Sequence, residues 1–257
     1  MQSLIASKVS FIRAAMRDAP LKTVLTEPIR STVHKLLTSL DTAEVRVSGG
    51  SETQQSSSRT EKFVLDLLGV PLITKSTGRA RSLFNLPMFA GDYFGFKRAV
   101  EHRNECRFIL PEADGVYAIH QPYGSQANPD ILLLDVRSKA IVCQFGIEIK
   151  SGGPTWNTHI QFADRSMLYI AFKDKQTHYF FGDHIRNKES LILALAWDEL
   201  QRELANALNE EARANGLKNM CVPYPKQEFR GQDLEEGSEA RHTEIKEWLS
   251  TSPGPSA

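Results

Sequence analysis

The chain has 257 residues, of which 41% are apolar and 24% are charged, enough for one substantial core with helical additions. The 31 basic and 31 acidic residues cancel, so the composition argues against a strong non-specific nucleic-acid binder. Three cysteines without a CxxC spacing predict neither a disulfide framework nor a zinc site.

Charge is nevertheless spread unevenly along the chain. Residues 232–257 contain six acids and two bases, so this segment carries −4 and the remainder carries +4. No segment approaches the 18 consecutive apolar residues of a membrane span, and the N-terminus lacks the apolar core and cleavage site of a targeting peptide. We therefore expect a soluble, cytoplasmic protein.

The N-terminal region, residues 1–47, is expected to be helical. Apolar residues at helical spacing predict one helix over about residues 3–17 and a second that begins at Pro28. Both are interpreted as packing helices, and a dimer contact is the alternative.

A polar loop over residues 48–58 is predicted to precede a short helix, Glu61 to Leu68, with Thr60 as its cap. Glu61 would then be a solvated glutamate of the first helical turn. Residues 70–104 are rich in basic side chains, and Arg79 and Arg81 lie in a segment that could contact phosphates. The alternative for these arginines is an ordinary solvated loop.

Two apolar runs separated by a tight polar turn predict a β-hairpin in the middle of the chain. The runs are residues 131–134 and 140–149, and the turn is residues 137–139. Asp130 opens the first strand and Glu148 lies near the end of the second, so antiparallel pairing should bring them together. Because strand side chains alternate between faces, Lys150 should share a face with Glu148.

Further strands are expected before and after this hairpin. Residues 108–110 and 116–119 precede it, and residues 167–172 and 178–181 follow it. A long helix over residues 189–215 is predicted to end at Gly216, and residues 235–250 to form a last short helix before a disordered tail. Together these elements predict an α/β protein with a sheet of about five strands and helices on its faces.

The paired carboxylates suggest a metal site. Two neighbouring carboxylates repel each other unless a cation lies between them, and Mg²⁺ binds through one or two carboxylates, water and phosphate oxygens. Lys150 could orient an attacking water or balance negative charge at a phosphate. The alternative is structural, with Asp130 capping a turn and Glu148 pairing with Lys150 on a solvated face.

Pro129-Asp130 followed by Glu148-Ile149-Lys150 resembles the PD-(D/E)xK nuclease signature, most closely that of type II restriction endonucleases. The flanking segments that share this resemblance are Gly124-Ser125-Gln126, Pro154-Thr155-Trp156-Asn157 and Tyr179-Phe180-Phe181-Gly182-Asp183. The resemblance covers roughly residues 105–185. It implies a restriction-endonuclease-like mixed sheet within a catalytic domain of residues 59–231, followed by an acidic helix and tail at 232–257.

The same resemblance implies a Mg²⁺-dependent cut of double-stranded DNA that leaves 5′-phosphates. Asp130 and Glu148 would hold the metal, with Glu61 as a candidate supporting ligand, and Lys150 would position the attacking water. Since a palindrome needs two active sites, we expect a homodimer. The candidate DNA contacts are Ser125, Gln126 and Asn157 near the cut, together with Lys226, Gln227 and Arg230 in a base-reading segment.

Two other functions remain open at this stage. One is a DNA repair or recombination nuclease with the same fold that recognises structure and not sequence. The other is a non-catalytic DNA-binding protein whose nuclease-like hairpin is inert.

Overall fold

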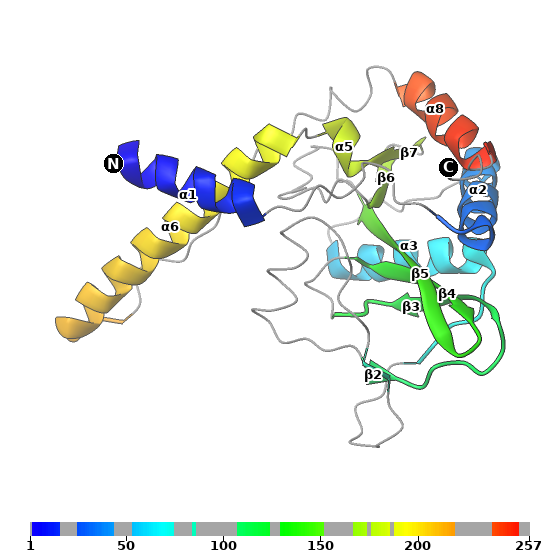
Figure 1. The fold of residues 1–257 in the computed structure, drawn as a ribbon, viewed down its shortest axis with the longest axis horizontal. Helices are drawn as coiled ribbons and strands as arrows, with labels where there is room; N and C mark the ends of the chain where they lie inside the picture. Colours follow the sequence, from blue (N-terminus) through cyan, green and yellow to red (C-terminus); the bar gives the residue numbers. More distant parts are fainter. Residues whose placement is uncertain are drawn as a thin grey trace.

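The computed structural model describes residues 2–15, 25–43, 53–74, 84–85, 107–123, 129–151, 167–173, 176–185, 188–218 and 238–251. These residues form an α/β fold whose centre is a five-stranded, mostly antiparallel sheet flanked by helices (Figure 1). The α/β class and the size of the sheet were both predicted from the sequence and are confirmed.

The sheet has the strand order β3-β4-β5-β6-β7. Its members are β3 (Gly115–His120), β4 (Ile131–Arg137), β5 (Ala140–Ser151), β6 (Leu168–Lys173) and β7 (Gln176–Phe181). The pairing is antiparallel throughout except between β5 and β6, which are parallel. A separate two-stranded pair joins β1 (Phe84–Asn85) to β2 (Arg107–Phe108).

The hairpin of β4 and β5 is closed by a two-residue turn. Ser138 and Lys139 have φ angles of 49° and 61°, the left-handed pair that a type I′ turn requires. The backbone N–H of Ser138 donates to Asp114 Oδ1 at 2.7 Å, which ties the turn to the start of β3. The turn sets the pairing of Arg137 with Ala140, and a bulge next to Val136 then shifts the register by one residue, so that Asp135 pairs with Cys143.

Helices cover one face of the sheet. They are α2 (Glu27–Thr42), α3 (Thr53–Leu68) and α8 (Ser238–Ser250). One buried apolar cluster contains Leu36 of α2, Val64 of α3 and Ile245 of α8 together with Leu133 and Ile147 of the hairpin. The helices expected in separate N- and C-terminal regions thus share the core of the central sheet.

The opposite face of β4 is also buried. Leu132, Leu134 and Val136 pack there with Phe108 and Ile119. Burial on both faces explains why β4 is an unbroken apolar run and not an alternating one.

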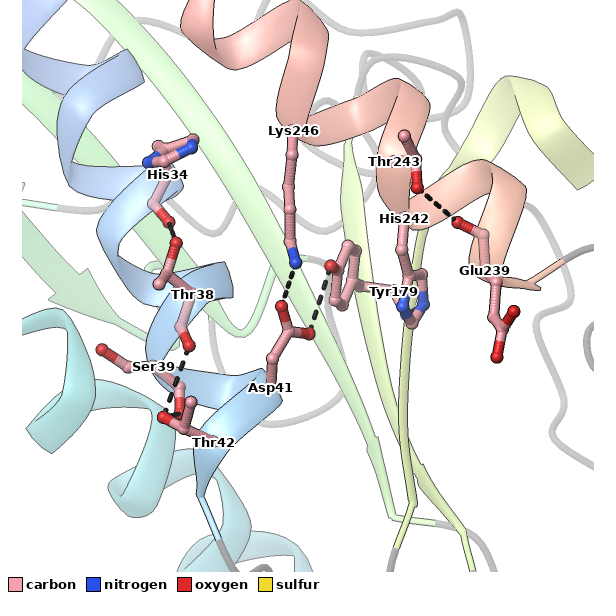
Figure 2. Close-up of polar contacts among 10 residues, drawn as sticks. All are labelled: His34, Thr38, Ser39, Asp41, Thr42, Tyr179, Glu239, His242, Thr243 and Lys246. Carbon is pink, nitrogen blue, oxygen red and sulfur yellow. Dashed lines mark hydrogen bonds and ion pairs between the residues drawn. The ribbon is translucent and has the colours of Figure 1, made fainter.

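Helix α8 is attached to the edge of the sheet by a cluster of polar and aromatic side chains (Figure 2). Asp41 of α2 accepts a hydrogen bond from the Tyr179 hydroxyl at 3.3 Å and forms an ion pair with Lys246 of α8. The His242 ring stacks on Tyr179 with centroids 3.6 Å apart, and its Nε2 accepts the Tyr179 backbone N–H at 3.2 Å. Burial lowers the pKa of His242 to about 4, which keeps this nitrogen an acceptor.

Histidine side chains accept hydrogen bonds from two backbone N–H groups of the edge strand β7. His242 accepts the N–H of Tyr179, and Nδ1 of His184, in the short helix α5 (Gly182–Ile185), accepts the N–H of Phe181 at 3.3 Å. Covered edge groups do not offer a template for pairing with another strand.

Helices α1 (Gln2–Ala15) and α6 (Lys188–Ala214) lie side by side and project away from the sheet as an arm (Figure 1). Lys8 of α1 forms ion pairs with Glu199 and Glu203 of α6, and Arg13 pairs with Glu189 at 2.7 Å. Because higher numbers on α1 meet lower numbers on α6, the two helices are antiparallel.

One boundary differs clearly from the sequence prediction. Helix α3 begins at Thr53, so the polar loop predicted over residues 48–58 is wrong from residue 53 onward, and Thr60 does not cap the helix. Adding a residue to an existing helix is much easier than nucleating one, so the buried C-terminal half of α3 can extend through polar residues of weak propensity. None of the described helices has the length and apolar character needed to cross a membrane.

Candidate active site

The open end of the β4–β5 hairpin brings Asp130 and Glu148 together. Ile131 pairs with Ile147, so the next antiparallel position outward joins Asp130 to Glu148. The Oδ2 atom of Asp130 accepts the backbone N–H of Ile149 at 2.7 Å, which fixes the carboxylate against β5. The structure thus places these two predicted site residues as the hairpin pattern indicates.

Lys150 lies on the same face of β5 as Glu148 and contacts it directly. Its Nζ donates to Glu148 Oε1 at 2.5 Å. The Glu148 side chain is 3% exposed and that of Lys150 is 27% exposed, so the ammonium group lies between the buried carboxylate and solvent. This is not the solvated pair of the structural alternative, because the Glu148 carboxylate is buried.

The second oxygen of Glu148, Oε2, is fully buried and has no hydrogen-bond partner among the described residues. A buried carboxylate oxygen without a donor costs free energy. A cation at this point would satisfy it.

Glu61 of α3 reaches the same region from the neighbouring helix. Its Oε2 lies 2.6 Å from His120 Nε2 and accepts the Gln121 side-chain amide at 3.0 Å. Glu61 is only 3% exposed, so the expectation of a solvated first-turn glutamate is wrong. The reason is the earlier start of α3, which puts Glu61 two turns inside the helix on the side that buries Val64 and Leu68.

Gln121 connects Glu61 to Asp130 and was missed by sequence reasoning. Its backbone N–H donates to the Asp130 carbonyl oxygen at 2.6 Å while its side chain donates to Glu61. Gln121 has a φ of 45°, a left-handed conformation that is uncommon outside glycine and often found at functional sites. Nothing in the sequence marks this position except that it directly follows a strand.

The electrostatics of the site are dominated by crowded negative charge. Burial, and then the neighbouring carboxylate of Glu148, raise the pKa of Asp130 from 3.8 to about 7. Lys150 and the Ile149 N–H act in the opposite direction, and Glu61 adds a further upward effect. Glu148 and Glu61 are therefore both close enough to influence Asp130.

These features fit a hard divalent cation held by two carboxylates. Among the described residues, no three His, Cys, Asp or Glu side chains are arranged as a ready-made metal site. Mg²⁺ does not need one, because it keeps several waters and takes phosphate oxygens of its substrate. The protein would supply Asp130 and Glu148, with Glu61 held behind them by His120 and Gln121.

Eight candidate DNA contacts fall outside the described residues. They are Arg79, Arg81, Ser125, Gln126, Asn157, Lys226, Gln227 and Arg230. They remain predictions from the sequence.

Comparison with known proteins adds no relative. No family model matches the chain, and neither the curated proteins nor the solved structures contain a match.

Proposed function

We propose that the protein is a Mg²⁺-dependent, site-specific double-strand DNA endonuclease of the type II restriction kind. The observation that carries the proposal is the meeting of Asp130, Glu148 and Lys150 at one end of a buried hairpin, where one carboxylate oxygen of Glu148 has no hydrogen-bond partner in the described part of the chain. The α3 helix ahead of the hairpin and the mixed five-stranded sheet agree with the restriction-endonuclease-like fold that we propose.

Asp130 and Glu148 would hold Mg²⁺, and Glu61 would support their orientation or complete the ligand set. When bound, Mg²⁺ lowers the pKa of a coordinated water and offsets charge on a scissile phosphate. Lys150 provides a fixed positive charge beside Glu148, and its partly exposed ammonium can orient the attacking water or stabilise negative charge on the phosphate.

The raised pKa of Asp130 makes loading of the site pH-dependent. A metal ligand must be deprotonated, and with a pKa of about 7 the metal-free carboxyl group is partly protonated at neutral pH. Metal affinity and cleavage should therefore both rise as the pH is raised from 6 to 8.

Cutting both strands of a palindromic site requires two copies of this active site, so we propose that the working form is a homodimer. Hydrolysis in line at phosphorus would leave 5′-phosphate and 3′-hydroxyl ends, as is usual for the nuclease family that the chain resembles.

The decisive experiment is digestion of a large, fully sequenced DNA by the purified protein with Mg²⁺ and with EDTA. Lys150→Ala and Asp130→Asn should abolish cutting. Lys139→Ala is the matched control, because Lys139 lies in the distant turn of the same hairpin and its side chain is 72% exposed.

Discrete fragments that require Mg²⁺ and disappear in the two site variants would support the proposal, and the sequenced ends would reveal the recognition site. A smear would instead favour a repair or recombination nuclease. Intact DNA under all conditions would refute catalysis and leave a non-catalytic DNA-binding protein.

A further inference from the structure

The ammonium group of Lys150 stands between the Glu148 carboxylate and solvent. Its Nζ lies 2.5 Å from Glu148 Oε1, and the lysine side chain is 27% exposed whereas that of Glu148 is 3% exposed. A cation that comes from solvent to Glu148 must therefore pass Lys150 or replace it. The other carboxylate oxygen, Oε2, is fully buried and has no hydrogen-bond partner among the described residues, so Lys150 satisfies only half of the carboxylate.

The charge of Lys150 acts on both carboxylates of the pair. Burial and Glu148 raise the pKa of Asp130, whereas Lys150 lowers it. Two buried carboxylates need a compensating cation, and Lys150 provides a single positive charge for the two of them. The pair therefore keeps an excess of negative charge that a divalent ion would neutralise better than one ammonium group.

Of the two partners in the Lys150–Glu148 contact, the lysine is the one that is able to move. An ammonium group is strongly hydrated and is carried on a flexible four-carbon stem. Because the side chain is already partly exposed, it can turn outward without any movement of β5. Glu148 is buried and has no comparable freedom.

We propose that Lys150 is a built-in cation that competes with the divalent metal for Glu148. Loading of the site moves the ammonium group from Glu148 Oε1 to the solvent side of the site, from which a DNA phosphate would approach. The event that loads the site thus also makes Lys150 available to the substrate. This inference rests on the proposed function, because it takes Asp130 and Glu148 as the metal ligands.

The first test is isothermal titration calorimetry of the DNA-free protein with MgCl₂ at pH 8.5, above the pKa of Asp130. Lys150→Met removes the positive charge at similar length, and Lys150→Gln also keeps a donor for Glu148. Both variants should bind Mg²⁺ about tenfold more tightly than the wild type, because a unit charge beside a divalent ion is removed. Lys139→Met is the matched control, since Lys139 lies in the distant turn of the same hairpin and is 72% exposed, and its affinity should be unchanged.

The second test follows the lysine in the wild-type protein, so it does not depend on the folding of a variant. The protein is briefly acetylated with an amine-reactive reagent in EDTA or in Mg²⁺, and the modification of each lysine is measured by mass spectrometry. Lys150 should react several-fold faster in Mg²⁺, because Glu148 no longer holds its ammonium group. Lys139 should react at the same rate in both conditions.

The outcomes separate this inference from the proposed nuclease. Tighter Mg²⁺ binding by both variants and faster labelling of Lys150 support it, whether or not the protein cuts DNA. An affinity that is unchanged or weaker in the variants, or labelling that Mg²⁺ slows or leaves unchanged, overturns it without touching a nuclease activity seen in the wild type. Failure of the wild type and both variants to bind Mg²⁺ overturns this inference and the proposed function together.

Discussion

Replacement of Asp130 by asparagine should stabilise the metal-free protein. Asp130 is forced to carry its charge beside the buried Glu148, and asparagine removes that charge while its amide oxygen can still accept the Ile149 N–H. The same substitution removes a proposed metal ligand, so gain of stability and loss of Mg²⁺ binding should appear together.

The size and pH dependence of the effect follow from the pKa. The folded state raises the pKa of Asp130 from 3.8 to about 7, so the native protein binds the proton more tightly than the unfolded chain. Wild-type stability must therefore fall as the pH rises through this window. The full shift corresponds to about 4 kcal/mol, and solvent screening of the partly exposed side chain reduces this to about 2 kcal/mol.

The assay is urea and thermal unfolding in EDTA between pH 5 and pH 8. At pH 8 the free energy of unfolding of Asp130→Asn should exceed that of the wild type by about 2 kcal/mol, and its melting temperature should be about 6 °C higher. At pH 5 the two proteins should be nearly equal, because Asp130 is then protonated. Added Mg²⁺ should raise the melting temperature of the wild type only.

Asp66→Asn serves as the control, because Asp66 is an exposed carboxylate on α3. It should change stability little at any pH. The reasoning would be refuted if Asp130→Asn were no more stable than the wild type at pH 8, or if its advantage were the same at pH 5.

Three further predictions concern stability elsewhere in the fold. The pKa of His242 is lowered to about 4, so its contribution is present above pH 6.5 and lost toward pH 4; urea unfolding should show an acid-side loss of about 1–2 kcal/mol that His242→Gln lacks. The double change Ser138→Asn with Lys139→Gly suits the positive φ angles of the turn and should raise the free energy of unfolding by about 1 kcal/mol, which would appear as a higher urea midpoint. A lower midpoint would contradict the type I′ geometry. Leu133→Ala empties a fully buried core position and should cost about 2–5 kcal/mol in thermal unfolding, whereas a loss below 1 kcal/mol would mean that this core is loosely packed.

Local patterns in the sequence were sufficient for much of the fold. Apolar periodicity predicted the start of α2 and both ends of α6 to within one residue, because an amphipathic stripe is a property of neighbouring positions. The hairpin was predicted for the same reason, and its antiparallel register, which includes a one-residue bulge between Asp135 and Val136, brings Asp130 to Glu148.

The rest of the site was decided by tertiary structure. Glu61 is separated from His120 and Gln121 by about sixty residues, so no local pattern could reveal that they meet. The burial of Glu61 depends on α3 extending back to Thr53 and packing on the sheet, which the polar sequence of its first half does not indicate.

The parallel pairing of β5 with β6 was also decided by tertiary structure, because two parallel strands cannot be joined by a tight hairpin turn that the local sequence would reveal. The sequence by itself determined which residues form the central hairpin and its charged end. Only the assembled sheet and helices decided how deeply those charges are buried and which neighbours they repel, because burial and charge–charge distance depend on contacts between segments far apart in the chain.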